Sequence, residues 1–192
     1  MQTLESLQSI FKDRIFKIPD YQRGYAWQKN QLIDFWEDIV NLPYDHQHYT
    51  GMLTLNSADG QTNQWILERW LINDRNTRPY YVVDGQQRLT TFIIFISEFT
   101  KLVRNLDENV GKKDSEIFLG TFSLADISND YLAVTNPRDI SQRSYKFSYE
   151  VDDPSFKYMR HKILGEPDGG DVTETFYTLN LECAMKFFAD NL

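Results

Sequence analysis

The residues best suited to chemistry are five in a row, Asp84-Gly85-Gln86-Gln87-Arg88, which lie between a β-branched, aromatic run and a long helical pattern. A helix start leaves backbone N–H groups without intrahelical partners, and these groups favour an anion together with the helix dipole. Gly85 allows close approach to the backbone, and Arg88 offers a fork of donors suited to phosphate oxygens. Asp84 could hold a metal ion or a ribose hydroxyl. The five residues therefore indicate a phosphate site at a strand-to-helix turn.

The same five residues also have a purely structural interpretation. Asp84 and Gln87 lie three residues apart and fit a capping box, in which each side chain satisfies a backbone N–H at the helix start. Asp-Gly is also an ordinary turn dipeptide. Local pattern alone favours this interpretation, because helix caps are far commoner than phosphate sites. Both interpretations stay open on the pattern of the residues.

A second candidate segment runs from Tyr21 to Trp27. Gln22 and Arg23 offer amide and guanidinium donors, and the aromatic residues interleaved with them could stack on a base or wall a pocket. The alternative is that Tyr25 and Trp27 pin a loop against the core while Arg23 pairs with an acid. The residues by themselves leave the two interpretations balanced.

Hydrophobic periodicity predicts the elements that position these segments. Apolar residues at steps of three and four predict a long helix from Leu89 to Leu106, directly after a strand at Tyr80 to Val83. Residues 57–79 are predicted to form an insertion, either a hairpin or a short helix. Weaker patterns predict a helix over residues 4–11, a strand over 15–18, a helix over 28–42 and a strand over 49–56.

The second half of the chain mixes its signals. Residues 105–115 are charged and polar, which predicts a linker. Alternation predicts a strand over 145–151, and Asp153 followed by Pro154 predicts a helix that ends near Leu164. A last helix is predicted from about Thr173, with one face formed by Tyr177, Leu181, Ala184 and Phe188.

Composition indicates a cytosolic globular protein. The chain has 192 residues, of which 41% are hydrophobic, so it can bury a sizeable core. The single cysteine, Cys183, lies in an apolar helical stretch and is predicted to be a core or near-core thiol in a reducing compartment. The most hydrophobic stretch is too short to cross a bilayer. We therefore expect a soluble, cytoplasmic protein with no membrane partner.

Charge limits what the chain can do with DNA. The sequence has 20 Lys and Arg against 28 Asp and Glu, a formal net charge of −8. Binding through DNA phosphates is driven by counterion release and favours a basic excess. Two basic clusters exist, one of Arg138, Arg143 and Lys146 and one of Lys157, Arg160, His161 and Lys162, although a solvated face is the commoner explanation for each. Any DNA contact by this chain is expected to be weak or confined to one edge.

Four separated segments carry a resemblance to a known family. They are Ile18-Pro19-Asp20-Tyr21-Gln22-Arg23-Gly24-Tyr25-Ala26-Trp27, Tyr49-Thr50-Gly51-Met52-Leu53, Val82-Val83-Asp84-Gly85-Gln86-Gln87-Arg88-Leu89-Thr90-Thr91 and Tyr177-Thr178-Leu179-Asn180-Leu181. Together they resemble the N-terminal domain of the GmrS and GmrSD modification-dependent restriction proteins. The first and third segments are specific, whereas the second and fourth are weak by themselves.

The resemblance implies an α+β fold similar to ParB and sulfiredoxin, in which a small mixed sheet is packed with helices and followed by a mainly helical extension. It implies a nucleotide-binding domain over residues 1–108, with 57–79 as an insertion, and an extension over 109–192 that continues in a longer protein. It also makes the 84–88 turn a nucleoside-triphosphate site that works with Mg²⁺.

The resemblance also implies roles for individual residues. Catalytic roles fall to Asp84, Gln87 and Arg88, and Asp84 is the expected Mg²⁺ ligand. The nucleotide-binding residues that it implies are Gln22, Arg23, Tyr25, Trp27, Asp84, Gly85, Gln86, Arg88, Thr90 and Thr91. The implied partners are the nucleotide, modified or foreign DNA in the full-length protein, and a nuclease domain or subunit.

Two functions of different classes follow. The first is a nucleotide-binding and hydrolysing domain of a DNA restriction protein. The second is a non-catalytic module in which the 84–88 turn is structural and the domain senses modified DNA or a partner protein. Nothing in the chain resembles the His-Asn-His pattern of a nuclease, so we expect no DNA cleavage by this chain alone.

Overall fold

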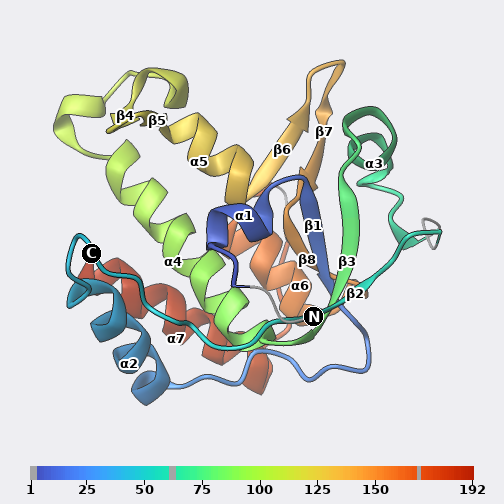
Figure 1. Cartoon of the computed structure of the whole chain (residues 1–192), viewed down its shortest axis with the longest axis horizontal. Coiled ribbons are helices and arrows are strands. Elements are labelled where there is room, and N and C mark those ends of the chain that lie inside the picture. Colours follow the sequence, from blue (N-terminus) through green and yellow to red (C-terminus); the bar gives the residue numbers. More distant parts are fainter. Residues whose placement is uncertain (1–3, 61–63, 168–169) are drawn as a thin grey trace.

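Strand β3 (Arg78–Asp84) is an inner strand of a four-stranded mixed sheet, and it runs directly into the long helix α4 (Gln86–Arg104) (Figure 1). The computed structural model describes residues 4–60, 64–167 and 170–192. The strand order is β2-β3-β1-β8, in which β1 (Arg14–Ile18) lies parallel to β3 and to β8 (Phe147–Tyr149). Strand β2 (Thr54–Ser57) pairs antiparallel with β3. The prediction of a strand followed at once by the long helix is confirmed, and the structure places that strand inside the sheet.

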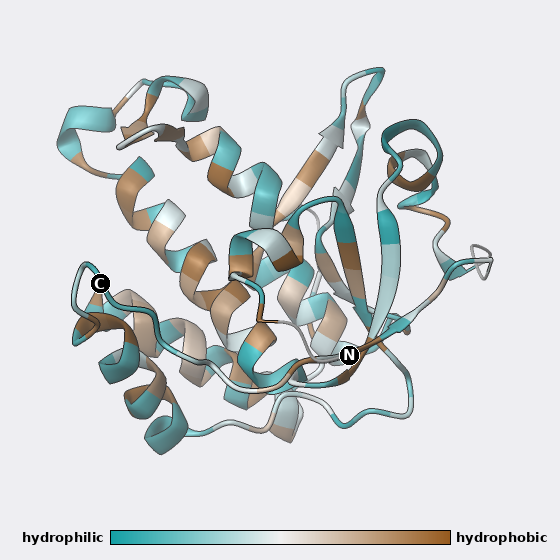
Figure 2. Cartoon of the chain, in the orientation of Figure 1, coloured by the Kyte–Doolittle hydropathy of each residue, from teal (hydrophilic) through white to brown (hydrophobic). Residues whose placement is uncertain are grey.

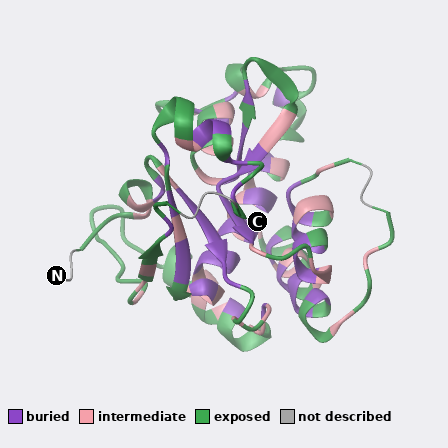
Figure 3. Cartoon of the chain, turned by 90° about the vertical axis from the view of Figure 1, so that its right-hand side faces the viewer, coloured by how far each residue is buried: buried purple, intermediate pink, exposed green. Residues whose placement is uncertain are grey.

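The helices that cover the sheet share one aromatic core. Helix α4 packs against α7 (Phe176–Asn191), and α7 also contacts α2 (Lys29–Val40). Hydrophobic residues recur along α4 (Figure 2), as its period requires. The rings of Phe35, Phe95 and Phe188, one from each of α2, α4 and α7, meet with centroids 5.5 to 6.4 Å apart. Strands β1 and β8 are mostly buried (Figure 3), whereas β3 is buried in part and β2 has no buried residue.

Shorter elements complete the chain. Helix α1 (Leu7–Phe11) precedes β1, and the insertion contains helix α3 (Arg69–Arg75). After α4 come two 3₁₀ turns (Asp107–Asn109 and Asp114–Glu116), a small hairpin of β4 (Phe118–Leu119) and β5 (Phe122–Ser123), and helix α5 (Leu124–Tyr131). Strands β6 (Ala133–Asn136) and β7 (Asp139–Tyr145) form a hairpin that projects from the body (Figure 1). Helix α6 (Pro154–Tyr158) continues as one π-helical turn, Met159–Ile163.

The second half of the chain completes the sheet and the core of the first. β8 supplies the edge strand beside β1, and α7 packs on α4. The division at residue 108 therefore stays a prediction about domain organisation, and the packing crosses it. No helix within the described residues is long and apolar enough to cross a membrane. The likeness to ParB and sulfiredoxin likewise stays a prediction, while the α+β class with a small mixed sheet is confirmed.

The prediction for Cys183 is wrong. Its side chain is exposed. Helix α7 buries Leu181, Ala184 and Phe188 on one stripe, and residue 183 lies about 100° of helical rotation away from residue 184. The local composition suggested burial, but the helical phase places the thiol on the outer face.

Candidate functional site

Gly85 alone links β3 to α4. It is the N-cap residue of the helix and has a φ of 89°, a left-handed conformation that favours glycine. A Cβ at this position would lie 3.0 Å from Leu53 Cδ1 and 3.1 Å from the Met52 carbonyl oxygen. Because the N-cap residue has no side chain, it caps none of the first-turn N–H groups of α4. These groups remain available to an anion.

Asp84 lies outside the helix and is exposed. One of its carboxylate oxygens, Oδ1, accepts a hydrogen bond from the Gly85 backbone N–H at 2.8 Å. The predicted capping box of Asp84 and Gln87 does not form, because the left-handed Gly85 takes the N-cap position. The carboxylate is therefore held at the turn with one side open to solvent.

The two glutamines of the turn bind the loop that precedes α2. Gln86 Nε2 donates to the Arg23 carbonyl oxygen at 2.7 Å. Gln87 Nε2 donates to the Gly24 carbonyl oxygen at 3.2 Å, and its Oε1 accepts from the Ala26 backbone N–H at 2.8 Å. Both ends of the Gln87 amide are thus in use. Gln86 and Gln87 therefore hold residues 23–26 of the loop against the start of α4.

Gln22 and Arg23 lie on that loop. Gln22 Nε2 donates to the Val83 carbonyl oxygen at 2.9 Å, so the loop is tied to the end of β3 as well. Arg23 is exposed, and within the described part of the chain its guanidinium has no hydrogen-bond or ion-pair partner. Arg23 is therefore free to contact a ligand beside the turn.

Arg88 is seated on the segment before β2. Its Nη2 donates to the Met52 carbonyl oxygen at 2.5 Å. A Cβ on Gly51 would lie 2.6 Å from Arg88 Nη1 and 2.8 Å from its Cζ, so only glycine leaves room for the guanidinium. The side chain is half-buried and keeps donors beyond the one that Met52 uses. Its position is therefore fixed before any ligand arrives.

Four other predicted nucleotide-binding residues face the core. Tyr25, Thr90 and Thr91 are at most 1% exposed, and the Tyr25 hydroxyl lies 2.7 Å from Thr91 Oγ1. Burial raises the pKa of the Tyr25 hydroxyl. The threonine hydroxyls donate to the carbonyl oxygens of the helical turn before them, and Trp27 packs edge-on against Phe35. These four residues position the loop and the turn from inside.

The fourth segment supports the loop from α7. The ring of Tyr177 covers Gly24, since a Cβ there would lie 2.5 Å from the ring. Asn180 Nδ2 donates to the Tyr25 carbonyl oxygen at 3.2 Å. All four sequence segments therefore meet at the start of α4, including the two that are weak alone. Gly51, Met52 and Asn180 have roles that residue type and local spacing did not indicate.

The comparison with protein families covers the same segments. The sequence model described as the GmrSD restriction endonuclease, N-terminal domain, matches residues 7–182. The chain belongs to this family. It is therefore a domain related to DNA restriction. A search of curated proteins finds no match.

The donor set of this GmrSD domain suits Mg²⁺ only together with a ligand. Within the described residues no group of three or more His, Cys, Asp or Glu side chains could hold a metal ion. Mg²⁺ commonly keeps several waters and binds one or two carboxylates together with substrate phosphates. Asp84, exposed beside a phosphate-compatible helix start, fits that arrangement.

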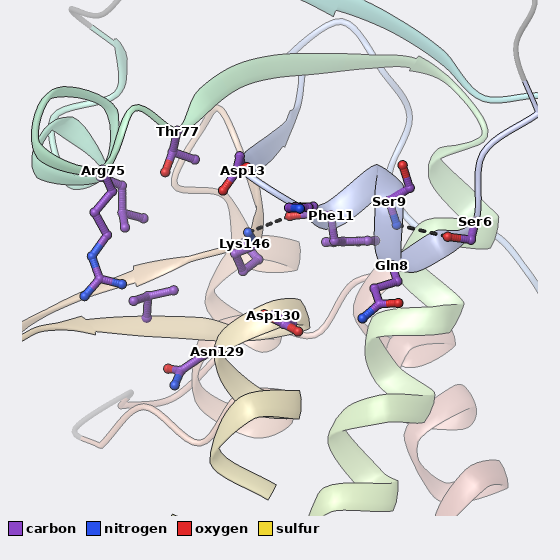
Figure 4. Close-up of a pocket in the computed structure, with 13 residues that line it drawn as sticks. Ser6, Gln8, Ser9, Phe11, Asp13, Arg75, Thr77, Asn129, Asp130 and Lys146 are labelled. Carbon is purple, nitrogen blue, oxygen red and sulfur yellow. Dashed lines mark hydrogen bonds between the residues drawn. The ribbon is translucent and has the colours of Figure 1, made fainter. Parts of the chain in front are cut away.

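A cavity of about 700 Å³ lies at the other end of β1 from the turn. Lys146 lines it, is 7% exposed and donates through Nζ to the Phe11 carbonyl oxygen at 2.8 Å (Figure 4). Burial lowers the pKa of the Lys146 ammonium to about 8, and the carboxylates of Asp130 and Asp13 offset part of this. A second cavity, of about 650 Å³, lies between α2 and α7. Neither cavity includes a residue of the 84–88 turn.

Proposed function

We propose that this GmrSD domain binds a nucleoside triphosphate with Mg²⁺ at the start of α4 and hydrolyses it, as part of a restriction protein that defends against foreign or modified DNA. One observation carries the proposal. The uncapped helix start at Gly85 is flanked on its exposed side by Asp84, Arg23 and the preset guanidinium of Arg88. Two cations and one carboxylate around free N–H groups suit a phosphate chain with its metal ion.

Each polar group has a distinct role in this proposal. The first-turn N–H groups of α4, from Gln86 onward, bind phosphate oxygens. Arg88 and Arg23 neutralise the charge that develops on the phosphates. Arg88 is already fixed in position by Met52, and Arg23 lies on the loop beside the turn. Gln86, Gln87 and Gln22 act as positioning residues, because their amides hold the loop that carries Arg23.

Asp84 carries the chemistry of hydrolysis. Its Oδ1 is fixed by the Gly85 N–H, and the rest of the carboxylate is open to hold the metal ion or to orient the attacking water. Bound Mg²⁺ would supply neutralisation of the phosphate oxygens. The neighbouring N–H groups then bind the charge that accumulates as the bond to the leaving phosphate breaks.

The alternative is a sensor without catalysis. It is favoured by the internal hydrogen bonds that Gln86 and Gln87 donate and by the position of the turn outside both cavities. In this hypothesis Gly85 and Arg88 only shape a scaffold, and the domain recognises modified DNA or a partner protein. A nuclease domain or subunit would act on that signal in either case.

Ligand binding to the isolated chain tests the proposal. Thermal unfolding is followed with ATP, GTP, CTP and UTP, each with Mg²⁺, and phosphate release is measured in parallel. A ligand that binds only the folded state adds about 2.7 kcal/mol of stability at a hundredfold excess over its dissociation constant. We expect at least one triphosphate to raise the melting temperature and to be hydrolysed.

Variants separate a site from a scaffold. Arg23→Ala removes an exposed guanidinium without an internal partner, so the free protein should melt unchanged while the nucleotide-induced shift falls. Asp84→Asn keeps an oxygen for the Gly85 N–H and should preserve the fold but lose turnover. Lys157→Ala, which removes an exposed charge on α6, should alter neither measurement. Unchanged hydrolysis in Asp84→Asn establishes the sensor hypothesis instead.

A further inference from the structure

Arginines gather at the end of the sheet opposite to the 84–88 turn. Strand β3 runs seven residues from Arg78 to Asp84, which separates its ends by roughly 20 Å. Helix α3 lies at the Arg78 end beside the β6–β7 hairpin (Figure 1), and Arg138 of the hairpin turn lies 3.4 Å from Asp74 of α3. We call the following residues the arginine surface: Arg69, Arg75, Arg78, Arg138 and Arg143.

The guanidinium groups of Arg138, Arg75 and Arg143 are not held in strong ion pairs. The Arg138 side chain is 84% exposed and its partner Asp74 50% exposed, so this pair is weak in water. Arg75 lies over the Trp70 ring at 5.4 Å and Arg143 over the Tyr145 ring at 5.5 Å. A guanidinium that lies over an aromatic ring still has N–H donors that can bind oxygen acceptors.

The acidic residue of the hairpin, Asp139, makes hydrogen bonds within the hairpin. Asp139 Oδ1 accepts hydrogen bonds from the Ser141 backbone N–H at 3.1 Å and from its hydroxyl at 2.6 Å, which turns the carboxylate back onto the strand. The other basic cluster of the chain differs. Its Arg160 is paired with Glu166 and with Asp152, so its central guanidinium is already neutralised. The other cluster therefore presents its exposed charge through Lys157 and Lys162, whereas the arginine surface presents guanidinium groups.

We propose that the arginine surface binds the backbone of duplex DNA and that the β6–β7 hairpin enters the major groove. A two-stranded ribbon fits this groove, and the arginines of the hairpin and of the neighbouring α3 and β3 would bind phosphates along the groove wall. Ile140, 86% exposed next to the hairpin turn, provides an apolar contact for base edges. Because the chain has a net charge of −8, the rest of its surface repels DNA, and we expect binding at the arginine surface alone. The inference rests on DNA as the substrate of the restriction protein and is independent of nucleotide binding at α4.

Salt dependence of duplex binding tests the inference. Fluorescence anisotropy with a labelled 20-base-pair duplex is measured between about 50 and 200 mM salt, the range in which phosphate contacts dominate. Arg138→Ala should weaken binding about eightfold at 0.1 M salt and reduce the salt slope by about one, since one released counterion is lost. Ile140→Ser should weaken binding with the slope unchanged, because an apolar contact releases no counterion.

Matched controls decide the outcome. Lys157→Ala, from the other basic cluster, should bind DNA like the unchanged chain. Equal losses in Arg138→Ala and Lys157→Ala, or no duplex binding by the unchanged chain at the lowest salt, would overturn the inference, and equal binding of single-stranded DNA would reject groove docking. Arg138→Ala should keep the nucleotide-induced thermal shift, and Asp84→Asn should keep DNA binding. Failure of one proposal is therefore distinguishable from failure of the other.

Discussion

Gln87 and Ala26 are joined as neighbouring strands would be, with the Gln87 Oε1 accepting from the Ala26 backbone N–H at 2.8 Å. The other end of the same amide donates to the Gly24 carbonyl oxygen at 3.2 Å. The amide of Gln87 thus binds a backbone N–H and a backbone carbonyl of the loop, as the backbone of a neighbouring strand would. The distance between Arg23 on that loop and Asp84 on the turn depends on this contact.

Replacement of Gln87 by glutamate should separate its two hydrogen bonds. Gln87→Glu keeps the acceptor for Ala26 but sets an oxygen against the Gly24 carbonyl, which leaves that carbonyl without a donor. We expect a loss of about 1–3 kcal/mol in the free energy of unfolding, measured by urea denaturation. Gln31→Glu on α2 is the control, because its Oε1 accepts from the Gln28 N–H and a carboxylate does so equally well. Equal effects of the two changes would contradict this role for Gln87.

The insertion is fixed to the sheet by a buried ion pair. Lys17 Nζ lies 3.0 Å from Glu68 Oε2 and 2.8 Å from the Gln64 carbonyl oxygen, and 4.6 Å from the centre of the Trp65 ring. Glu68→Ala leaves the ammonium buried without its carboxylate, so we expect a loss of about 3–5 kcal/mol in the free energy of unfolding.

A double variant tests whether that loss comes from the unpaired charge. Lys17→Met with Glu68→Leu removes both charges and keeps apolar volume, so much of the stability should return. Urea denaturation of Lys17→Met, Glu68→Leu and the double variant gives the coupling energy between the two side chains. Additive losses would show that the pair does not hold the insertion on β1.

Strong periodicity made the core predictable, as α4 shows. Its apolar residues recur along five turns, and both its position after β3 and its buried face follow from the sequence. The β6–β7 hairpin was not predictable in this way. Its strand β6 has only four residues, its turn carries Pro137 rather than an Asn-Gly or Asp-Gly pair, and only Ser144 and Tyr145 of β7 are buried. Asn136-Pro137 indicates a turn, but without alternation in the flanking residues the sequence did not indicate a two-stranded ribbon.

The candidate site was predictable in outline and not in its contacts. Gly85 and Asp84 lie where a strand-to-helix turn requires them. The partners of Gln86 and Gln87 are backbone atoms of residues 23–26, about 60 positions earlier, and no local pattern reports such a contact. The same holds for Arg88, whose seat at Gly51 depends on the absence of a side chain. Long-range backbone contacts decide which polar groups remain free.

Stability should rise with pH between about 8 and 10.5 because of Lys146. Its pKa is lowered from 10.5 to about 8 by burial, so in this window the unfolded chain binds more protons than the folded one. The rise should reach at most about 3 kcal/mol. Below pH 8 both states carry the proton and this contribution is flat. Above about pH 10 buried tyrosines oppose it, since the pKa values of Tyr81 and Tyr145 are raised to about 12.

Lys146→Met isolates that contribution. Methionine keeps the apolar stem and removes the titrating group. Above pH 8 the unfolding free energy of the unchanged protein should therefore rise steadily relative to that of Lys146→Met. Urea denaturation at pH 7, 8, 9 and 9.5 measures it. A difference that stays constant across this range would show that the ammonium in the cavity is as well solvated as one on the surface.

Gly51 should prove to be a functional glycine, although it carries no chemistry. Its φ of +101° is strained for any other residue, and a Cβ would lie 2.6 Å from Arg88 Nη1, so Gly51→Ala must displace the guanidinium. Gly111→Ala is the matched control, because Gly111 has a φ of +82° and no atom within 4 Å of its Cβ position. Both changes should cost about 1–2 kcal/mol in the free energy of unfolding through backbone strain. Only Gly51→Ala should also reduce the nucleotide-induced thermal shift, since it alone moves Arg88. An equal nucleotide response in the two variants would show that the seat of Arg88 does not matter for binding.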